Sequence, residues 1–67
     1  MPDKETIGRR LRELRGVWRS QQDVADATGI ARDRISRYET GAVIPPDADK
    51  VKLAHYYGET VQDIFFT

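Results

Sequence analysis

Four polar side chains near the middle of the chain have a spacing that would place them together on one face of a helix. They are Arg32, Asp33, Ser36 and Arg37. An arginine can bind the O6 and N7 atoms of a guanine, and a carboxylate can accept a hydrogen bond from the amino group of a cytosine. We therefore predict that all four contact DNA bases. Asp33 is equally suited to form a surface ion pair with Arg37, four residues further on.

Two short predicted helices, joined by a tight turn within residues 20–41, would position this polar face. Ser20 can cap the first helix, with Asp23 completing a capping box. Gly29 stands where a left-handed residue ends a helix, and the second helix is predicted over residues 32–40. The residues expected to face inward are Val24, Ala25, Ile30, Ile35 and Tyr38. This layout is that of a helix-turn-helix, whose second helix enters the DNA major groove.

Three further helices are predicted around this pair. A first helix over residues 6–16 would bury Ile7, Leu11 and Leu14, and Trp18 after it is expected to pack against the core. An extended segment with two prolines leads to a helix over residues 47–57. That helix would carry Val51, Ala54 and Tyr57 on one face, and Thr60 would cap a last short helix that buries Val61, Ile64 and Phe65. We expect an all-α fold of five helices in a single domain over residues 1–67.

The charges of the chain are unevenly distributed although they sum to zero. Residues 9–37 contain eight arginines and four acids, a net charge of +4, whereas residues 38–67 have a net charge of −3. Arginine suits bidentate contacts to phosphate and guanine. The asymmetry favours DNA as a partner once it is combined with the helix-turn-helix pattern.

Three residues are candidates for contacts to DNA phosphates: Gln21, Arg10 and Arg34. Gln21 would lie in the first turn of a helix, where its amide and the free backbone N–H groups can bind a phosphate. Arg15 and Glu39 lie at the inner edges of otherwise apolar faces. We expect these two to form a structural ion pair that ties the first helix to the third.

Several functional classes lack the residues they need. The chain has no cysteine, and His55 is its single histidine, so neither a disulfide nor a protein zinc site is expected. No arrangement of nucleophile, base or paired carboxylates suggests an enzyme, and no metal or cofactor is expected. Apolar residues are too scattered for a membrane span, and no signal-peptide core follows Met1. We therefore expect a cytoplasmic protein.

A resemblance to a known family supports the same reading across nearly the whole chain. The pattern Gln21-x-x-Val24-Ala25-x-x-x-Gly29-Ile30, followed by Ile35-Ser36-x-x-Glu39-x-Gly41, resembles the lambda-repressor/Cro-type helix-turn-helix proteins, also called the XRE family. The resemblance implies a compact five-helix domain that binds operator DNA as a symmetric dimer. By position, it implies a phosphate contact for Gln21, base contacts for Arg32, Asp33 and Arg37, and a buried ion pair between Arg15 and Glu39.

These observations predict a sequence-specific transcriptional regulator that binds double-stranded DNA, most simply a repressor that acts by occupying its operator. A homodimer is expected, because one recognition helix contacts only a few base pairs. The segment around Val43 and Ile44 and the last helix with Phe66 are candidate dimer surfaces. We expect no effector-binding or catalytic domain after the last helix. The alternative is an antitoxin or another protein-interaction module that uses the same fold to bind a toxin or other protein partner.

Overall fold

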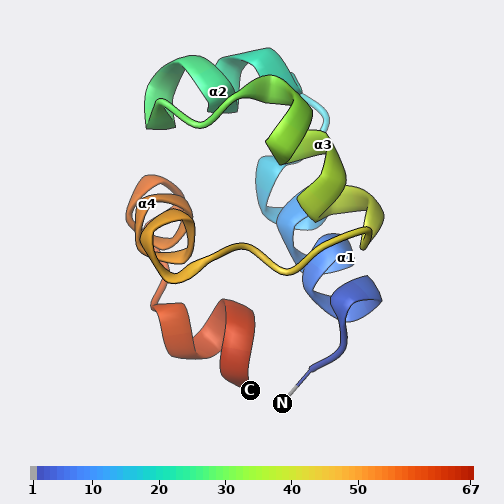
Figure 1. Cartoon of the computed structure of the whole chain (residues 1–67). Coiled ribbons are helices and arrows are strands. Elements are labelled where there is room, and N and C mark those ends of the chain that lie inside the picture. Colours follow the sequence, from blue (N-terminus) through green and yellow to red (C-terminus); the bar gives the residue numbers. More distant parts are fainter. Residues whose placement is uncertain (1) are drawn as a thin grey trace.

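The computed structural model describes residues 2–67, which contain five helical segments and no strand, as the predicted all-α fold requires. Residue 1 of the domain predicted over residues 1–67 lies outside the described part. Figure 1 shows the helices folded around a common centre. Their bounds are Lys4–Arg15 for α1, Gln21–Thr28 for α2, Arg32–Thr40 for α3, Asp47–Tyr57 for α4 and Gln62–Phe66 for η1, a short π-helical segment.

The first helix begins earlier than predicted. It was expected from residue 6, but it starts at Lys4 because Asp3 caps it: the Asp3 carboxylate accepts a hydrogen bond of 2.8 Å from the backbone N–H of Thr6. A capping aspartate satisfies one of the four N–H groups that a helix start leaves free. The same bond to the backbone lowers the pKa of the Asp3 carboxyl group.

The helix-turn-helix has the caps that its sequence predicted. Ser20 and Asp23 form a complete capping box at the start of α2, with bonds of 3.0 and 2.9 Å. Gly29 ends α2 with a φ of 76°, a left-handed conformation that is inexpensive for glycine. α3 starts after Ala31, which provides no side-chain cap. The turn therefore gets its geometry from Gly29 and from Ile30, which is buried beneath it.

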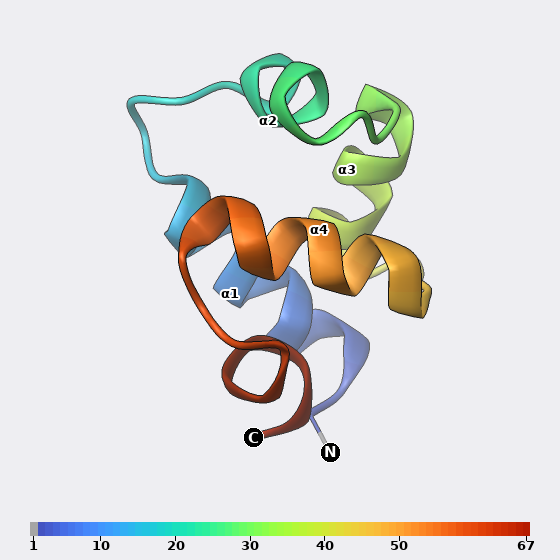
Figure 2. The same ribbon diagram turned by 90° about the vertical axis from the view of Figure 1, so that its left-hand side faces the viewer.

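The core is built from apolar side chains of all five segments. Its buried members are Ile7, Leu11, Val24, Ala25, Ile30, Ile35, Tyr38, Leu53, Ala54, Ile64 and Phe65. α1 contacts α3 and η1, while α2 contacts α3 and α4. Figures 1 and 2 both show η1 beside the start of α1. The arrangement leaves one side of α3 outside the core.

Val51 does not share the buried face of α4 with Ala54, and the predicted packing of Trp18 against the core is wrong. Val51 is 60% exposed, because α4 turns Asp49, Lys50, Leu53 and Ala54 toward the rest of the protein instead. Trp18 is 74% exposed and does not pack against the core. Its ring lies instead on the guanidinium of Arg19, with 4.0 Å between the guanidinium carbon and the ring centroid. Figure 2 shows the connection between α1 and α2 extending away from the other helices.

The last helix agrees with its prediction. The Thr60 hydroxyl accepts a hydrogen bond of 3.0 Å from the backbone N–H of Asp63. Ile64 and Phe65 are buried, and Val61 packs against the core with partial exposure. Phe66, the neighbour of Phe65, is 38% exposed.

Candidate nucleic-acid interface

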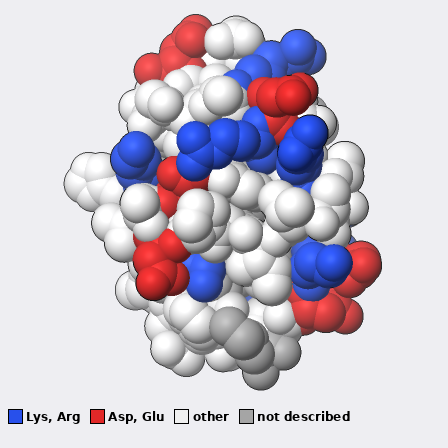
Figure 3. Space-filling model, viewed as in Figure 1, with Lys and Arg blue, Asp and Glu red and all other residues white. Residues whose placement is uncertain are grey.

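The outer face of α3 carries the four residues that were predicted to contact bases. Arg32, Asp33 and Arg37 are exposed and Ser36 is half-buried, because the helix turns Ile35 and Tyr38 into the core. Figure 3 shows several Lys and Arg side chains in the part of the surface where α3 lies in Figure 1. These four side chains lie together and face outward.

No internal contact holds the charged groups of this face. Among residues 2–67, the structure gives no hydrogen bond or ion pair to the side chains of Arg32, Asp33 or Arg37. Asp33 and Arg37 therefore do not form the surface ion pair that was the alternative to base contact. Their charged groups are free to meet an external partner.

Gln21, a predicted phosphate contact, is the first residue of α2 and is half-buried. Its amide nitrogen Nε2 donates a hydrogen bond of 3.1 Å to Oε1 of Glu39, near the end of α3. This contact between α2 and α3 was not expected from the sequence. No local signal could have indicated it, because the two residues are 18 positions apart.

Arg15 and Glu39 are brought together by the fold. Nε and Nη2 of Arg15 donate to the two carboxylate oxygens of Glu39 at 2.8 and 3.0 Å, a bidentate arrangement. Glu39 is 2% exposed. The hydrogen bond to Glu39 raises the pKa of the Arg15 guanidinium. Arg12 of α1 adds a bond to the backbone carbonyl of Glu39, which the sequence analysis did not anticipate.

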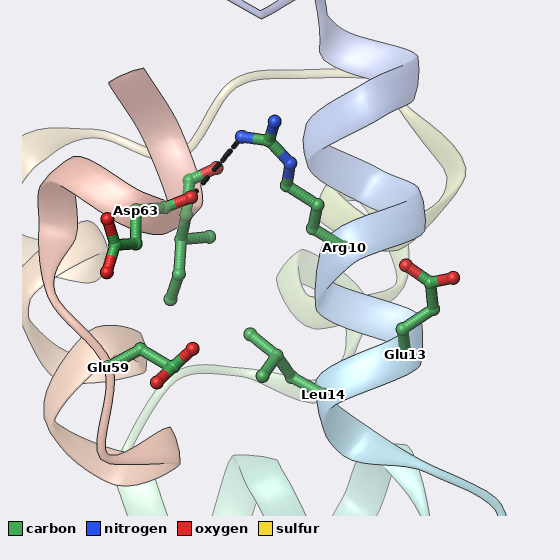
Figure 4. A pocket seen from close by; sticks show the side chains of 6 residues that line it. Arg10, Glu13, Leu14, Glu59 and Asp63 are labelled. Carbon is green, nitrogen blue, oxygen red and sulfur yellow. Dashed lines mark hydrogen bonds between the residues drawn. The ribbon is translucent and has the colours of Figure 1, made fainter. Parts of the chain in front are cut away.

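Arg10, another predicted phosphate contact, forms hydrogen bonds within the protein instead. Its guanidinium donates to the backbone carbonyls of Ile64 at 3.0 Å and Thr67 at 2.7 Å, and more weakly to that of Asp63 at 3.4 Å. Figure 4 shows this side chain reaching from α1 to the segment that contains Asp63. A cation at the end of a helix satisfies carbonyl groups that have no partner within the helix. Arg10 is therefore not among the DNA contacts that we propose below.

Arg34, the third predicted phosphate contact, belongs to a network between α3 and α4. Its guanidinium forms an ion pair with Asp49, which is 2% exposed, and donates a bond of 3.3 Å to the Tyr38 hydroxyl. Tyr38 in turn donates to Asp49. The bond to Tyr38, with the charge of Asp49, raises the pKa of Arg34. Sequence reasoning missed the buried role of Asp49, and Arg34 is likewise left out of the proposed DNA contacts.

The hydroxyl of Tyr57 on α4 gives the fold a dependence on alkaline pH. Burial, with a contribution from the charge of Glu39, raises the pKa of Tyr57 from 10.0 to about 12. The unfolded chain would release this proton near pH 10 and the folded chain only near pH 12. The contribution of Tyr57 to stability is therefore complete below pH 10 and decreases as the pH rises toward 12. We expect the free energy of unfolding, measured with urea, to fall more steeply over this range for the native chain than for Tyr57→Phe, and equal slopes would contradict the assignment.

Within residues 2–67, no helix has the length and hydrophobicity that crossing a membrane requires. The same part of the chain contains no group of three or more His, Asp or Glu side chains arranged to hold a metal ion.

Comparison with known proteins gives one family. The family model described as a helix-turn-helix domain matches residues 6–64, which include all of α2 and α3 and most of the remaining helices. Searches of the curated proteins and of the solved structures find no significant match. Because the family match covers most of the chain and agrees with the fold and with the free polar face of α3, this protein belongs to the helix-turn-helix domain family.

Proposed function

We propose that this protein is a sequence-specific transcriptional regulator of the Cro type, which represses by occupying operator DNA as a dimer. The observation that supports this most strongly is the unpaired outer face of α3. A helix-turn-helix places the start of this helix in the major groove, where its exposed side chains meet base edges. Arg32, Asp33, Ser36 and Arg37 are the proposed base contacts, and Gln21 is the proposed phosphate contact.

The distribution of free and bonded arginines strengthens the proposal. Five of the eight arginines donate hydrogen bonds within the described part of the chain: Arg10, Arg12, Arg15, Arg19 and Arg34. Most of the positive charge of residues 9–37 thus stabilises the fold. Two of the three arginines without such bonds, Arg32 and Arg37, lie on α3, and the third is Arg9 on α1. Two of these three arginines therefore lie where base contact is proposed.

A dimer would place two copies of α3 in successive turns of the major groove, about 34 Å apart. Exposed apolar side chains offer a surface for this association. Val43 and Ile44 in the α3–α4 connection are 40% and 41% exposed, and Phe66 is 38% exposed. We propose that the dimer interface includes these residues, since burying them would remove apolar area from water.

Replacing Arg37 by alanine tests the base contact directly. If Arg37 binds a guanine, the change should weaken binding to the preferred DNA by about 1–3 kcal/mol and relax the preference at one base position. Arg9→Ala is the matched control, because it removes an exposed arginine that lies on α1. An unchanged sequence preference for Arg37→Ala, measured by binding to a set of single-base variants, would remove Arg37 from the base contacts.

The experiment that tests the function as a whole is the selection of bound duplexes from a random DNA pool at near-physiological salt. A palindrome with half-sites one helical turn apart would support a dimeric operator-binding regulator. A reporter gene placed under a promoter that contains the recovered sequence would then distinguish repression from activation. Weak, salt-sensitive binding without a motif is the signature of non-specific phosphate contacts and would contradict the proposal.

A protein-interaction role, such as that of an antitoxin, is the second candidate. The observation that favours it is the exposed apolar pair in the α1–α2 connection, where Val17 is fully exposed and Trp18 is 74% exposed. Trp18 is the only tryptophan of the chain, and tryptophan is enriched at the centres of protein interfaces. Failure of the DNA selection would direct the search to protein partners of this connection.

A further inference from the structure

The Glu39 carboxylate on α3 connects this helix to side chains of two others. It lies in the last turn of α3 and accepts two hydrogen bonds from Arg15 of α1 and one from Gln21 of α2. The bidentate pair with Arg15 already ties α1 to α3 without Gln21. The additional bond connects Gln21, the proposed phosphate contact, to the buried carboxylate of Glu39.

This bond fixes which end of the Gln21 amide points toward Glu39. A side-chain amide has a donor end at Nε2 and an acceptor end at Oε1, and a half-turn of the amide exchanges them. An ionised carboxylate can only accept, so Glu39 selects the orientation with Nε2 toward it. One N–H of Nε2 is used by Glu39, and the other is left for a second acceptor. In the flipped orientation, Oε1 would occupy the present position of Nε2. An amide oxygen cannot donate, so it could bind neither the Glu39 carboxylate nor the second acceptor.

We propose that Glu39 is a positioning residue for DNA binding, which holds the Gln21 amide so that its second N–H meets a DNA phosphate. The inference rests on the phosphate contact proposed for Gln21. A phosphate oxygen is an acceptor and needs the donor end of the amide. Because the contact is to the DNA backbone, Glu39 affects the affinity for all sequences alike and leaves base preference unchanged.

A double-mutant cycle on DNA affinity tests this role. The variants are Glu39→Gln, Gln21→Ala and their combination, each assayed at a temperature at which circular dichroism shows it to be folded. The probes are a labelled duplex recovered from the random pool and a scrambled duplex of the same length. Gln21→Ala should weaken binding to both duplexes about tenfold, as the loss of a hydrogen bond to a charged group predicts. Glu39→Gln should produce part of this loss, because a neutral amide no longer selects the orientation of Gln21.

The combined variant decides between positioning and a purely structural role. If Glu39 acts through Gln21, the double variant binds no more weakly than Gln21→Ala alone. The control is the pair Glu39→Gln and Arg37→Ala, whose losses should multiply, since Arg37 lies outside this contact. Losses that multiply for Glu39→Gln and Gln21→Ala as well, or an unchanged affinity of Glu39→Gln, would overturn the inference. Binding of neither duplex by the native protein would instead contradict the proposed function itself.

A second measurement needs no variant of Glu39 and applies if Glu39→Gln does not fold. The side-chain amide signals of Gln21 in the NMR spectrum are identified by their loss in Gln21→Ala. We expect their protons to exchange with water more slowly than those of Gln62, which is exposed and has no side-chain hydrogen bond among the described residues. On addition of the recovered duplex, the Gln21 signals should shift and stay protected. Exchange as fast as that of Gln62, or no shift with bound DNA, would overturn the inference.

Discussion

Glu39→Ala should lower the free energy of unfolding by about 3 kcal/mol, the scale of removing one partner of a buried ion pair. The loss is large because three donors depend on one carboxylate: two on Arg15 and one on Gln21. Arg15 is only 20% exposed and would keep its charge without a partner. A domain of 60–100 residues loses about 4–8 °C of melting temperature per kcal/mol, so the Tm should fall by about 12–24 °C.

Thermal unfolding followed by far-ultraviolet circular dichroism measures this effect. Glu13→Ala is the matched control, because it removes an exposed glutamate from α1. Arg15→Ala and the double variant complete a cycle in which the two losses should not add. A melting temperature of Glu39→Ala equal to that of the native chain would show that the pair contributes nothing to stability.

Gly8→Ala should also destabilise the fold, by about 2 kcal/mol, although alanine favours helix formation. At Gly8, the backbone of α1 lies close to that of α3: an added Cβ would lie 2.5 Å from the carbonyl oxygen of Glu39 and 2.9 Å from that of Tyr38. Both atoms are backbone, so no side-chain rotation can relieve the overlap and the two helices must separate. Overpacking of this kind lowers the free energy of unfolding by up to about 3 kcal/mol. Replacing glycine by alanine within a helix raises it by about 1 kcal/mol.

Urea unfolding of Gly8→Ala, followed by circular dichroism, measures the net effect. The neighbouring change Arg9→Ala provides the control, because Arg9 is on the same helix but exposed. A Gly8→Ala variant as stable as the native chain would contradict the close crossing of α1 and α3. Because the outer face of α3 points away from this contact, Gly8→Ala protein that remains folded should keep its DNA sequence preference.

The local elements could be predicted from the sequence because their signals lie within a few residues of one another. The capping box of Ser20 and Asp23 and the left-handed Gly29 act over one turn of chain, and they fixed the bounds of α2. The periodic apolar residues of α3 likewise indicated which of its faces would stay outside the core. Even here, α1 starts two residues before its predicted start, because Asp3 caps it.

The tertiary structure alone decided which charged residues are free to act. Arg10 and Arg32 look alike in the sequence, yet Arg10 binds carbonyl groups 53–57 residues away, while Arg32 has no partner among the described residues. A long arginine side chain can reach many acceptors, and which of them it meets depends on how the helices pack. The same reason explains the bond of Gln21 to Glu39 and the exposure of Trp18. The sequence by itself therefore determined the helix-turn-helix and the polar face of α3, because short-range caps and periodicity specify them. Packing gave five of the eight arginines hydrogen bonds within the protein and left Arg9, Arg32 and Arg37 without one among the described residues.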